Sequence, residues 1–289
     1  MLLKTDMDFA QASIEKGTPE AFYLYLTDDA LQLPQKSSTR KCIKAVVKTV
    51  TAFPIISENR QIKNIIQVAG IKDEKEAQML SASGVDWLGF PLRLTRHQAD
   101  LSEDEAAKII HALKLPHFGV LITYLRKAEK IIALCRKLGT TKVQLHGKIK
   151  VSELRKLQTL SPELFVIRSL IVQHNNMEEL TATMRQCSPY VSAFITDTYD
   201  PATETCGATG KTHNWQISRQ LVESSSRPII LAGGLNPDNV RRAILEVKPA
   251  GVDAHTGLEG TDGRKQIQLV RAFVNEARVA FAQVSSQAL

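Results

Sequence analysis

From residue 62 onward, short apolar runs alternate with longer amphipathic stretches along the chain. Eight of these runs are rich in β-branched residues and do not alternate polar with apolar positions, which is typical of strands buried on both faces. The predicted strands span Ile62–Val68, Val85–Phe90, His117–Ile122, Lys142–Leu145, Leu164–Ile171, Val191–Thr196, Pro228–Leu231 and Gly251–Ala254. The stretches between and after them predict helices over Glu74–Ala82, Glu103–Leu113, Arg126–Leu138, Val151–Leu160, Met177–Gln186, Asn214–Val222, Pro237–Glu246 and Gly263–Phe281.

Several of these predicted helices carry signals at their ends. Ser102, with Glu105 three residues later, matches a capping box at the start of one helix. Asn236 followed by Pro237 predicts an N-cap and a first helical position. Gly139 stands where another helix should end. The helices are therefore supported by end signals as well as by periodicity.

Eight strand–helix units within about 220 residues predict an α/β protein with a (β/α)₈ TIM barrel. The alternative is a doubly wound open sheet, which would carry its phosphate loop after the first strand. At that point the chain reads Ala69-Gly-Ile-Lys, without a GxGxxG pattern, and its glycine loops follow the last three strands. This order favours a barrel over residues 62–283, followed by a C-terminal tail over 284–289.

Residues 1–61 do not fit the strand–helix repeat. Thr18–Leu33 is amphipathic, and Thr39–Phe53 is amphipathic and basic, so we expect a helical N-terminal extension. The extension is expected to pack on the barrel or at an oligomer interface, which leaves a homodimer open.

The composition places the chain among globular proteins, with 43% hydrophobic and 23% charged residues. The chain has no apolar run of 18 residues and no signal-like start, so we expect a cytoplasmic protein without a membrane partner. Cysteines form no CxxC pair, and histidines do not cluster with acidic residues, so no metal or cofactor is expected. The net charge of +7 suits an anionic substrate, whereas the dispersed basic residues argue against nucleic acid.

Two glycine-containing loops follow the last two predicted strands. Gly233 and Gly234 precede a helix, and Thr256 and Gly257 follow the final strand. Glycines let backbone N–H groups approach an anion, and the loops after strands seven and eight of such barrels commonly hold phosphate. Either loop alone is also consistent with a simple tight turn. Together they predict a small phosphorylated substrate.

Asp197 lies at the end of predicted strand six, on the face where barrel enzymes place catalytic groups. A carboxyl group there is a candidate general acid or base, and the alternative is a loop-capping role. The long loop that follows contains Gly207, Thr209 and Gly210. We expect this loop to cover the substrate and to contribute to the phosphate site.

Polar residues also mark strands four and five. Gln144 and His146 alternate with apolar neighbours at the end of strand four, so we expect them to line the substrate, although a lone histidine is also common as a structural residue. Arg168, inside strand five, is either a buried and paired arginine or a contact to a substrate anion.

Four segments together resemble the phosphoribosylanthranilate isomerase family of tryptophan biosynthesis, over about residues 62–283. They are Val143-Gln-Leu-His-Gly, Gly207-Ala-Thr-Gly-Lys-Thr-His-Asn-Trp, Leu231-Ala-Gly-Gly-Leu-Asn-Pro-Asp-Asn-Val and Gly251-Val-Asp-Ala-His-Thr-Gly-Leu-Glu. The resemblance implies an Amadori rearrangement in which Asp197 protonates the ribose ring oxygen. It also places five glycines in phosphate loops, namely Gly207, Gly210, Gly233, Gly234 and Gly257.

The chain departs from this family at the positions that handle the C2 proton and the anthranilate group. The family's first strand ends in Lys-Ile-Cys-Gly, whose cysteine is the general base, and Ala69 stands at that position here. The family holds the anthranilate carboxylate with an arginine after strand two, for which Arg93 and Arg96 are the candidates. His255 occupies a position that is often serine in the family.

A methyl group cannot accept a proton, and the loss of a general base typically costs about 10²–10⁴-fold in rate. Three interpretations follow. His255 or His146 acts as the base, because neutral imidazole suits this work near pH 7. Alternatively, the substrate differs and Asp197 drives another rearrangement, an elimination or a condensation. In the third interpretation, the chain binds a phosphosugar without catalysis.

Overall fold

The computed structural model of the chain describes residues 62–94, 99–173, 176–200, 205–206 and 212–286. The predicted N-terminal extension over 1–61 lies outside the described residues, as do Arg96, Gly207, Thr209 and Gly210. Among the described residues, no helix combines the length and the apolar character needed to cross a bilayer.

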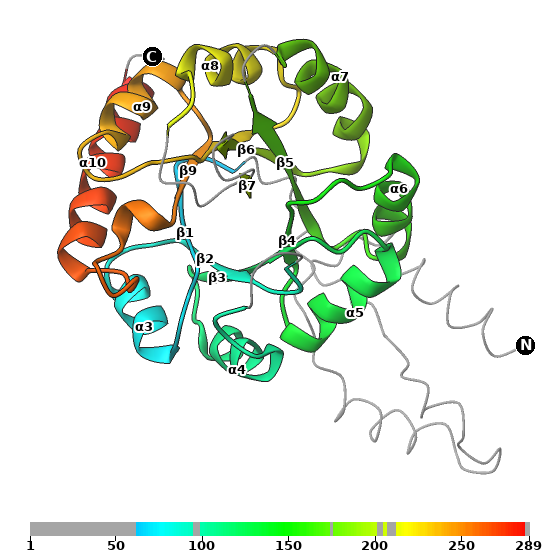
Figure 1. Ribbon diagram of the computed structural model, residues 1–289, viewed down its shortest axis with the longest axis horizontal. Coiled ribbons are helices and arrows are strands. Elements are labelled where there is room, and N and C mark those ends of the chain that lie inside the picture. The colour runs from blue at the N-terminus through cyan, green and yellow to red at the C-terminus, as the bar shows by residue number, and fades with distance from the viewer. Residues whose placement is uncertain (1–61, 95–98, 174–175, 201–204, 207–211, 287–289) are drawn as a thin grey trace, which may run out of the picture. The chain divides into compact units, whose positions relative to one another are not determined.

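Eight parallel strands close into a ring, which Figure 1 shows end-on. They are β1 (Ile65–Ala69), β2 (Trp87–Pro91), β3 (Phe118–Thr123), β4 (Lys142–Leu145), β5 (Phe165–Val172), β6 (Ala193–Asp200), β8 (Ile229–Leu231) and β9 (Gly251–Ala254). The β1–β9 and β5–β6 pairings close the ring. A further short strand, β7 (Thr205–Cys206), pairs antiparallel with the end of β6. The predicted (β/α)₈ barrel is therefore confirmed.

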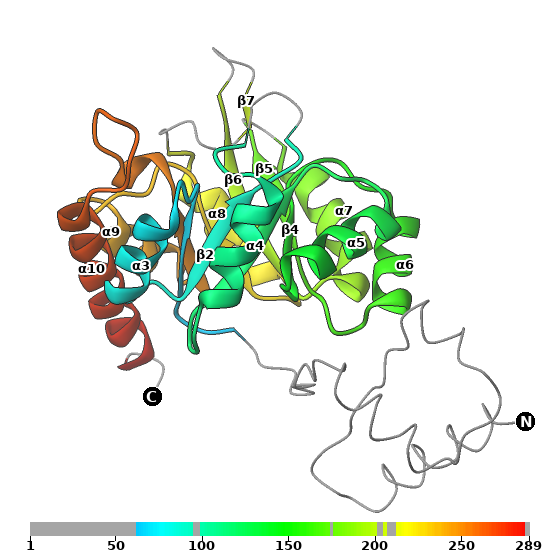
Figure 2. The ribbon, with the colours of Figure 1, turned by 90° about the horizontal axis from the view of Figure 1, so that it is seen from below.

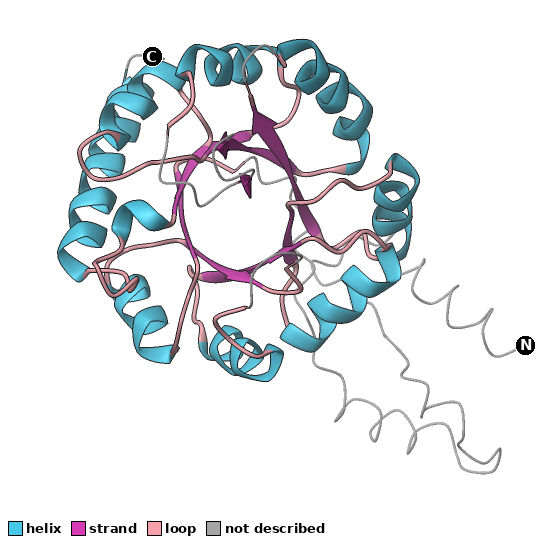
Figure 3. Cartoon of the chain, in the orientation of Figure 1, coloured by secondary structure: helices cyan, strands magenta, loops and turns pink. Residues whose placement is uncertain are grey.

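Helices surround the ring and cover its outer side, as Figure 3 shows. They are α3 (Glu74–Ala82), α4 (Glu103–Ala112), α5 (Ala128–Leu138), α6 (Val151–Leu160), α7 (Met177–Cys187), α8 (Trp215–Ser224), α9 (Val240–Val247) and α10 (Ile267–Ser286). Figure 2 shows the barrel from the side, with β7 projecting beyond the carboxyl ends of the strands. This end of the barrel carries the loops in which we expect the site.

The end signals hold for two helices and fail for a third. Ser102 forms the full capping box at the start of α4, and Gly139 adopts the left-handed conformation (φ 70°) at the end of α5. The predicted start of a helix at Pro237 is wrong, because α9 begins at Val240. The side chain of Asn236 accepts hydrogen bonds from the backbone N–H groups two and three residues further on, which builds a separate turn before the helix.

The last helix also differs from the expectation of a start at Gly263. Helix α10 begins at Ile267, because the preceding residues form a turn in which Gly263 donates its N–H to the carbonyl of Gly260. The helix continues to Ser286, so it runs through the predicted boundary between barrel and tail at 283 and 284.

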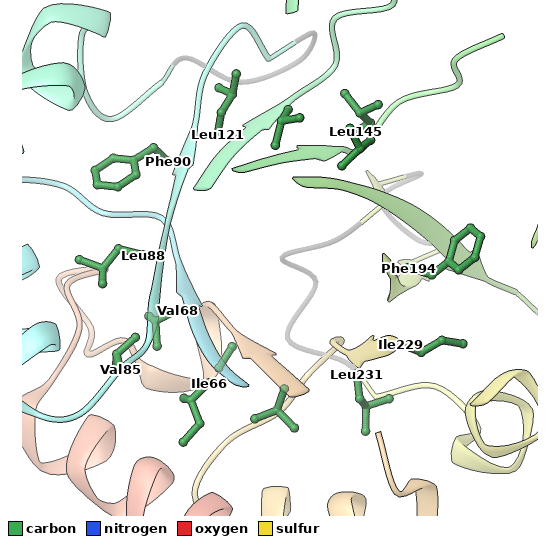
Figure 4. Packing of buried hydrophobic residues seen from close by; sticks show 14 of the residues in the cluster. Ile66, Val68, Val85, Leu88, Phe90, Leu121, Leu145, Phe194, Ile229 and Leu231 are labelled. Carbon is green, nitrogen blue, oxygen red and sulfur yellow. The ribbon is translucent and has the colours of Figure 1, made fainter. Parts of the chain in front are cut away.

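Two apolar clusters divide the core between the two faces of the strands. The larger one fills the space between strands and helices, and Figure 4 shows Leu88, Phe90 and Phe194 pointing outward into it. The smaller one lies inside the ring and includes Ile167 and Ile195. Because strand side chains alternate between faces, the polar residues that interrupt the inner face near its carboxyl end meet in the interior of the barrel.

Candidate active site

Asp197 lies near the carboxyl end of β6 and is only 9% exposed to solvent. One of its oxygens, Oδ1, accepts a 2.8 Å hydrogen bond from the backbone N–H of Thr198. Burial raises the pKa of the Asp197 carboxyl, while His146 and this backbone hydrogen bond act in the opposite direction. A buried carboxyl whose pKa is raised retains its proton to higher pH, as a general acid requires.

His146 directly follows β4, which is separated from the β6 strand of Asp197 by β5 alone. Its Nδ1 lies 3.7 Å from Asp197 Oδ2 and 3.1 Å from the hydroxyl oxygen of Ser169 on β5. The ring of Tyr124 packs edge-on against the imidazole, with 4.9 Å between ring centroids. The structure thus brings His146 and Asp197 together, on the same side of the site.

A layer of polar side chains crosses the barrel beneath these two groups. Gln67 on β1 donates a 3.0 Å hydrogen bond to Gln144 on β4, and Gln67 is paired in register with Asp253 on β9. Gln67 Oε1 and Asp253 Oδ1 are buried without a hydrogen-bond partner in the described part of the chain. Burial raises the pKa of Asp253 to about 8, Gln67 opposes this shift, and the charge of Asp197 adds to it. The sequence interpretation missed Asp253.

The available signal was its place in the strand. Asp253 is the polar member of a four-residue strand, between Val252 and Ala254, so alternation puts it on the opposite face from those two apolar side chains. A carboxyl group on the inner face of a barrel strand, near its carboxyl end, is a candidate active-site group.

His255 lies where β1 and β9 end side by side. Val68 pairs with Ala254, so Ala69 and His255 are the next positions along these neighbouring strands. The imidazole packs so closely on Gly70 that a Cβ atom there would overlap its Nε2. His255 Nε2 lies 3.4 Å from Glu259 Oε1, which in turn lies 2.7 Å from the buried Lys265 ammonium.

The protonation state of His255 follows from these surroundings. Burial and, to a lesser extent, the charge of Lys265 lower the pKa of His255 to about 4, although Glu259 opposes this shift. The imidazole is therefore neutral near pH 7. Its side chain is 28% exposed, so it borders the mouth of the barrel and is not sealed beneath it.

The two glycine loops pack against each other at the ends of β8 and β9. Gly233 and Gly234 have left-handed backbones, with φ angles of 104° and 62°. A Cβ atom at Gly257 would overlap the carbonyl oxygen of Leu235, so only glycine lets the β9 loop lie this close to the β8 loop. Thr256 begins a short 3₁₀ turn that ends at Leu258. This close packing of glycine backbones suits the recognition of a phosphate group.

The two described arginines that were candidates for a substrate contact have other partners in the structure. Arg168 donates to the carbonyl of Leu145 at 3.1 Å, and its register partners, Leu145 and Phe194, belong to the cluster between strands and helices. Arg168 therefore faces the helix layer, as the structural alternative required, and not the interior of the barrel. Arg93 forms an ion pair with Glu103 at the start of α4 and is largely exposed.

No group of three or more His, Cys, Asp or Glu side chains within the described ranges is arranged to hold a metal ion. The candidate site offers carboxyl and imidazole groups, with glycine loops beside them. The fold and this arrangement define the class: a TIM-barrel protein with a buried carboxyl group near the end of β6 and a pair of glycine loops after β8 and β9.

Comparison with known proteins identifies the family within this class. The family model for N-(5'-phosphoribosyl)anthranilate (PRA) isomerase matches residues 66–276. The chain belongs to this family.

Relatives from archaea and bacteria agree with this assignment. The chain is 36% identical over 225 residues to N-(5'-phosphoribosyl)anthranilate isomerase 2 of Methanosarcina mazei, covering 78% of this chain and 98% of the relative. It is 32% identical to the Haloferax volcanii isomerase, covering 74% of this chain and 93% of the relative. The Thermotoga maritima crystal structure of phosphoribosyl anthranilate isomerase superimposes with a TM-score of 0.64 at 26% identity, covering 74% of this chain and 98% of that one.

Proposed function

We propose that this chain isomerises N-(5'-phosphoribosyl)anthranilate to the corresponding 1-amino-1-deoxy-ketose 5-phosphate, with Asp197 as the general acid. The observation that carries the proposal is the buried Asp197 carboxyl, whose burial raises its pKa at the catalytic end of β6. A related isomerase structure holds a reduced carboxyphenylamino-deoxyribulose 5-phosphate and is 25% identical to this chain with a TM-score of 0.62.

The reaction needs two catalysed proton transfers, followed by a tautomerisation. Protonation of the ribose ring oxygen breaks the C1–O bond and leaves an iminium ion at C1, and removal of the C2 proton then gives an enaminol. Tautomerisation of the enaminol delivers a proton to C1 and forms the ketone at C2. Asp197 supports the first step, because a protonated carboxyl can donate to the ring oxygen. His146, 3.7 Å from Asp197, is placed to stabilise the carboxylate that remains.

The second step needs a base, and we propose that His255 supplies it. Ala69 takes the position at which the family resemblance implies a cysteine, and His255 follows the neighbouring strand at the same level. Its neutral imidazole can accept a proton, whereas His146 lies beside the acid. A dianionic substrate phosphate on the adjacent loops would favour the imidazolium and raise its low pKa toward a useful range.

The phosphate is proposed to bind at the loops of Gly233 and Gly257. Both loops border the end of the barrel at which Asp197 and His255 lie, so one ligand can reach the loops and both proton-transfer groups. Backbone N–H groups at close-packed glycines form an anion site without requiring a basic side chain.

We also propose a homodimer, because a Thermotoga maritima relative is described as dimeric. Light scattering of the purified protein tests this proposal.

The proposed reaction is tested by following the fluorescence of freshly prepared phosphoribosylanthranilate with wild-type protein and with Asp197→Asn. We expect turnover in the wild type and a loss of about 10²–10⁴-fold in the variant. Asp104→Asn is the matched control, because Asp104 is an exposed surface carboxyl paired with Lys137 on the outer helices. Equal turnover by wild type and Asp197→Asn would contradict the role of Asp197.

A second candidate function is a related reaction on a different phosphorylated substrate. It is favoured by Arg93, a candidate for binding the anthranilate carboxylate, whose guanidinium is already paired with the Glu103 carboxylate. Wild-type protein that is stabilised by phosphoribosyl ligands in a thermal shift assay, yet does not turn over phosphoribosylanthranilate, would select this alternative.

A further inference from the structure

Three side chains form a hydrogen-bonded chain beside Asp197. Thr198 follows Asp197 on β6, and its hydroxyl oxygen lies 2.9 Å from His213 Nδ1. His213 Nε2 lies 2.6 Å from the hydroxyl oxygen of Ser218 on α8. Thr198 is 5% exposed and Ser218 is fully buried, so water does not replace these partners readily. The imidazole thus connects the catalytic strand to the helix that follows it.

A neutral imidazole at His213 fixes the donor and acceptor roles of the two hydrogen bonds that it makes. Burial lowers the pKa of His213 to about 4, so the ring is neutral at physiological pH. A neutral imidazole has one N–H donor and one acceptor nitrogen. One hydroxyl therefore donates to the ring and the other accepts from it. Loss of the imidazole would leave two buried hydroxyl groups unpaired, an arrangement that folded proteins avoid.

The hydrogen-bonded side chains of Thr198, His213 and Ser218 support both Asp197 and the loop of Gly233. The backbone N–H of Thr198 holds Asp197 Oδ1 at 2.8 Å. A Cβ atom on Gly233 would overlap the Thr198 hydroxyl oxygen and would lie 3.1 Å from His213 Nδ1, so the first glycine of the β8 loop packs directly on this pair. Movement of His213 would therefore reach the acid on one side and the phosphate-type loop on the other.

We propose that His213 is a positioning residue that holds Asp197 and the Gly233 loop in their mutual geometry through Thr198 and Ser218. This inference rests on the proposed function only for its catalytic consequence. The positioning itself is a property of the protein without substrate. Histidine suits the position because its two ring nitrogens, on opposite sides of a rigid ring, reach one hydroxyl group on β6 and one on α8.

The test replaces His213 by Phe, which keeps a planar ring and removes both hydrogen bonds. A loosened Thr198 N–H stabilises the Asp197 carboxylate less, so the pKa of Asp197 should rise. General-acid activity is lost as pH rises through that pKa, so the alkaline limb of the kcat/KM profile should move to higher pH. Loop displacement should also raise KM, by about tenfold, since misplacement of about 1 Å costs up to about 10²-fold.

Companion variants separate positioning from a general loss of stability. Ser218→Ala removes only the far anchor of the imidazole and should shift the Asp197 titration in the same direction by a smaller amount. His213→Gln retains a donor and an acceptor and should restore part of the effect. Ser224→Ala is the matched control on the same helix, because the Ser224 hydroxyl donates to the carbonyls of Gln220 and Leu221 within that helix.

A readout without turnover keeps this inference distinct from the proposed function. The Asp197 carboxyl is titrated by ¹³C NMR in substrate-free protein, with Asp197→Asn for assignment, and affinity for inorganic phosphate is measured in parallel. A shifted Asp197 titration in His213→Phe, with no wild-type turnover, would support positioning and refute the isomerase. An unchanged titration and unchanged phosphate affinity in folded His213→Phe, or in Ser218→Ala should the former not fold, would overturn the positioning role.

Discussion

Replacing Asp253 by Asn should make the stability of the protein less dependent on pH. The side chain is buried beside Gln67, and its Oδ1 and Gln67 Oε1 both lack a partner within the described chain. A protonated Asp253 carries no charge in this buried site, and its hydroxyl supplies a donor where Asp253 Oδ1 and Gln67 Oε1 would otherwise both be acceptors. The asparagine side chain is a close isostere of that neutral acid, because its amide can donate in the same direction. Little disturbance of the fold is therefore expected at low pH.

The size of the effect follows from the pKa. Burial raises the pKa of Asp253 from 3.8 to about 8, so the folded protein holds a proton that the unfolded chain releases above about pH 4. The wild type therefore loses stability as pH rises from about 4 to about 8, at up to about 1.4 kcal/mol per pH unit. The Asp253→Asn variant has no titrating group at this position, so it lacks this pH-dependent loss of stability. Between pH 5 and pH 7 its stability relative to wild type should rise by about 2–3 kcal/mol.

Urea unfolding at pH 5, 6 and 7, monitored by circular dichroism and tryptophan fluorescence, measures this difference. The wild type, Asp253→Asn and the exposed control Asp104→Asn are compared at each pH. The control should stay within about 0.5 kcal/mol of wild type, as is usual for surface substitutions. A difference between Asp253→Asn and wild type that does not change with pH would refute a protonated Asp253 in the folded state.

Two further outcomes follow from the same geometry. Gly257→Ala should raise KM for phosphorylated ligands by about tenfold or more, because its Cβ would overlap the carbonyl oxygen of Leu235. Gly260→Ala is the control, because its Cβ would meet flexible side chains, and it should bind as wild type does. Equal phosphate affinity of the two variants, measured by calorimetry, would contradict phosphate binding at the Gly257 loop. His255→Gln should lower kcat by about 10²–10⁴-fold, and Ala69→Cys in that background should recover part of the lost activity. An unchanged kcat of His255→Gln in the phosphoribosylanthranilate fluorescence assay would rule out His255 as the base.

The sequence was most informative where a local pattern had a single physical explanation. Non-alternating β-branched runs separated by amphipathic stretches predicted strand–helix units, and the position of the glycine loops after the last strands favoured a closed barrel over a doubly wound sheet. Asp197 and His146 were placed at the catalytic end by their positions at strand ends, and the structure brings them within 3.7 Å of each other. These features depend on strand order and strand ends, which a one-dimensional pattern contains.

Features that depend on which face a residue occupies were harder to predict. Strand β5 is apolar on both faces, so alternation could not show that Arg168 points to the helix layer and not to the interior. The start of α9 was misplaced because the side chain of Asn236 builds its own turn, which competes with helix formation. The contact between Thr198 and His213 joins residues 15 positions apart in the sequence, so no local pattern contains it.

An Amadori isomerisation driven by Asp197 is tested most directly by following the atoms of the reaction. Phosphoribosylanthranilate is converted in D₂O, and the product is analysed by mass spectrometry and NMR. We expect an aminoketose carrying one solvent deuterium at C1, formed by the wild type and not above background by Asp197→Asn. A wild-type protein that leaves the substrate unchanged, or converts it without deuterium at C1, would refute this mechanism.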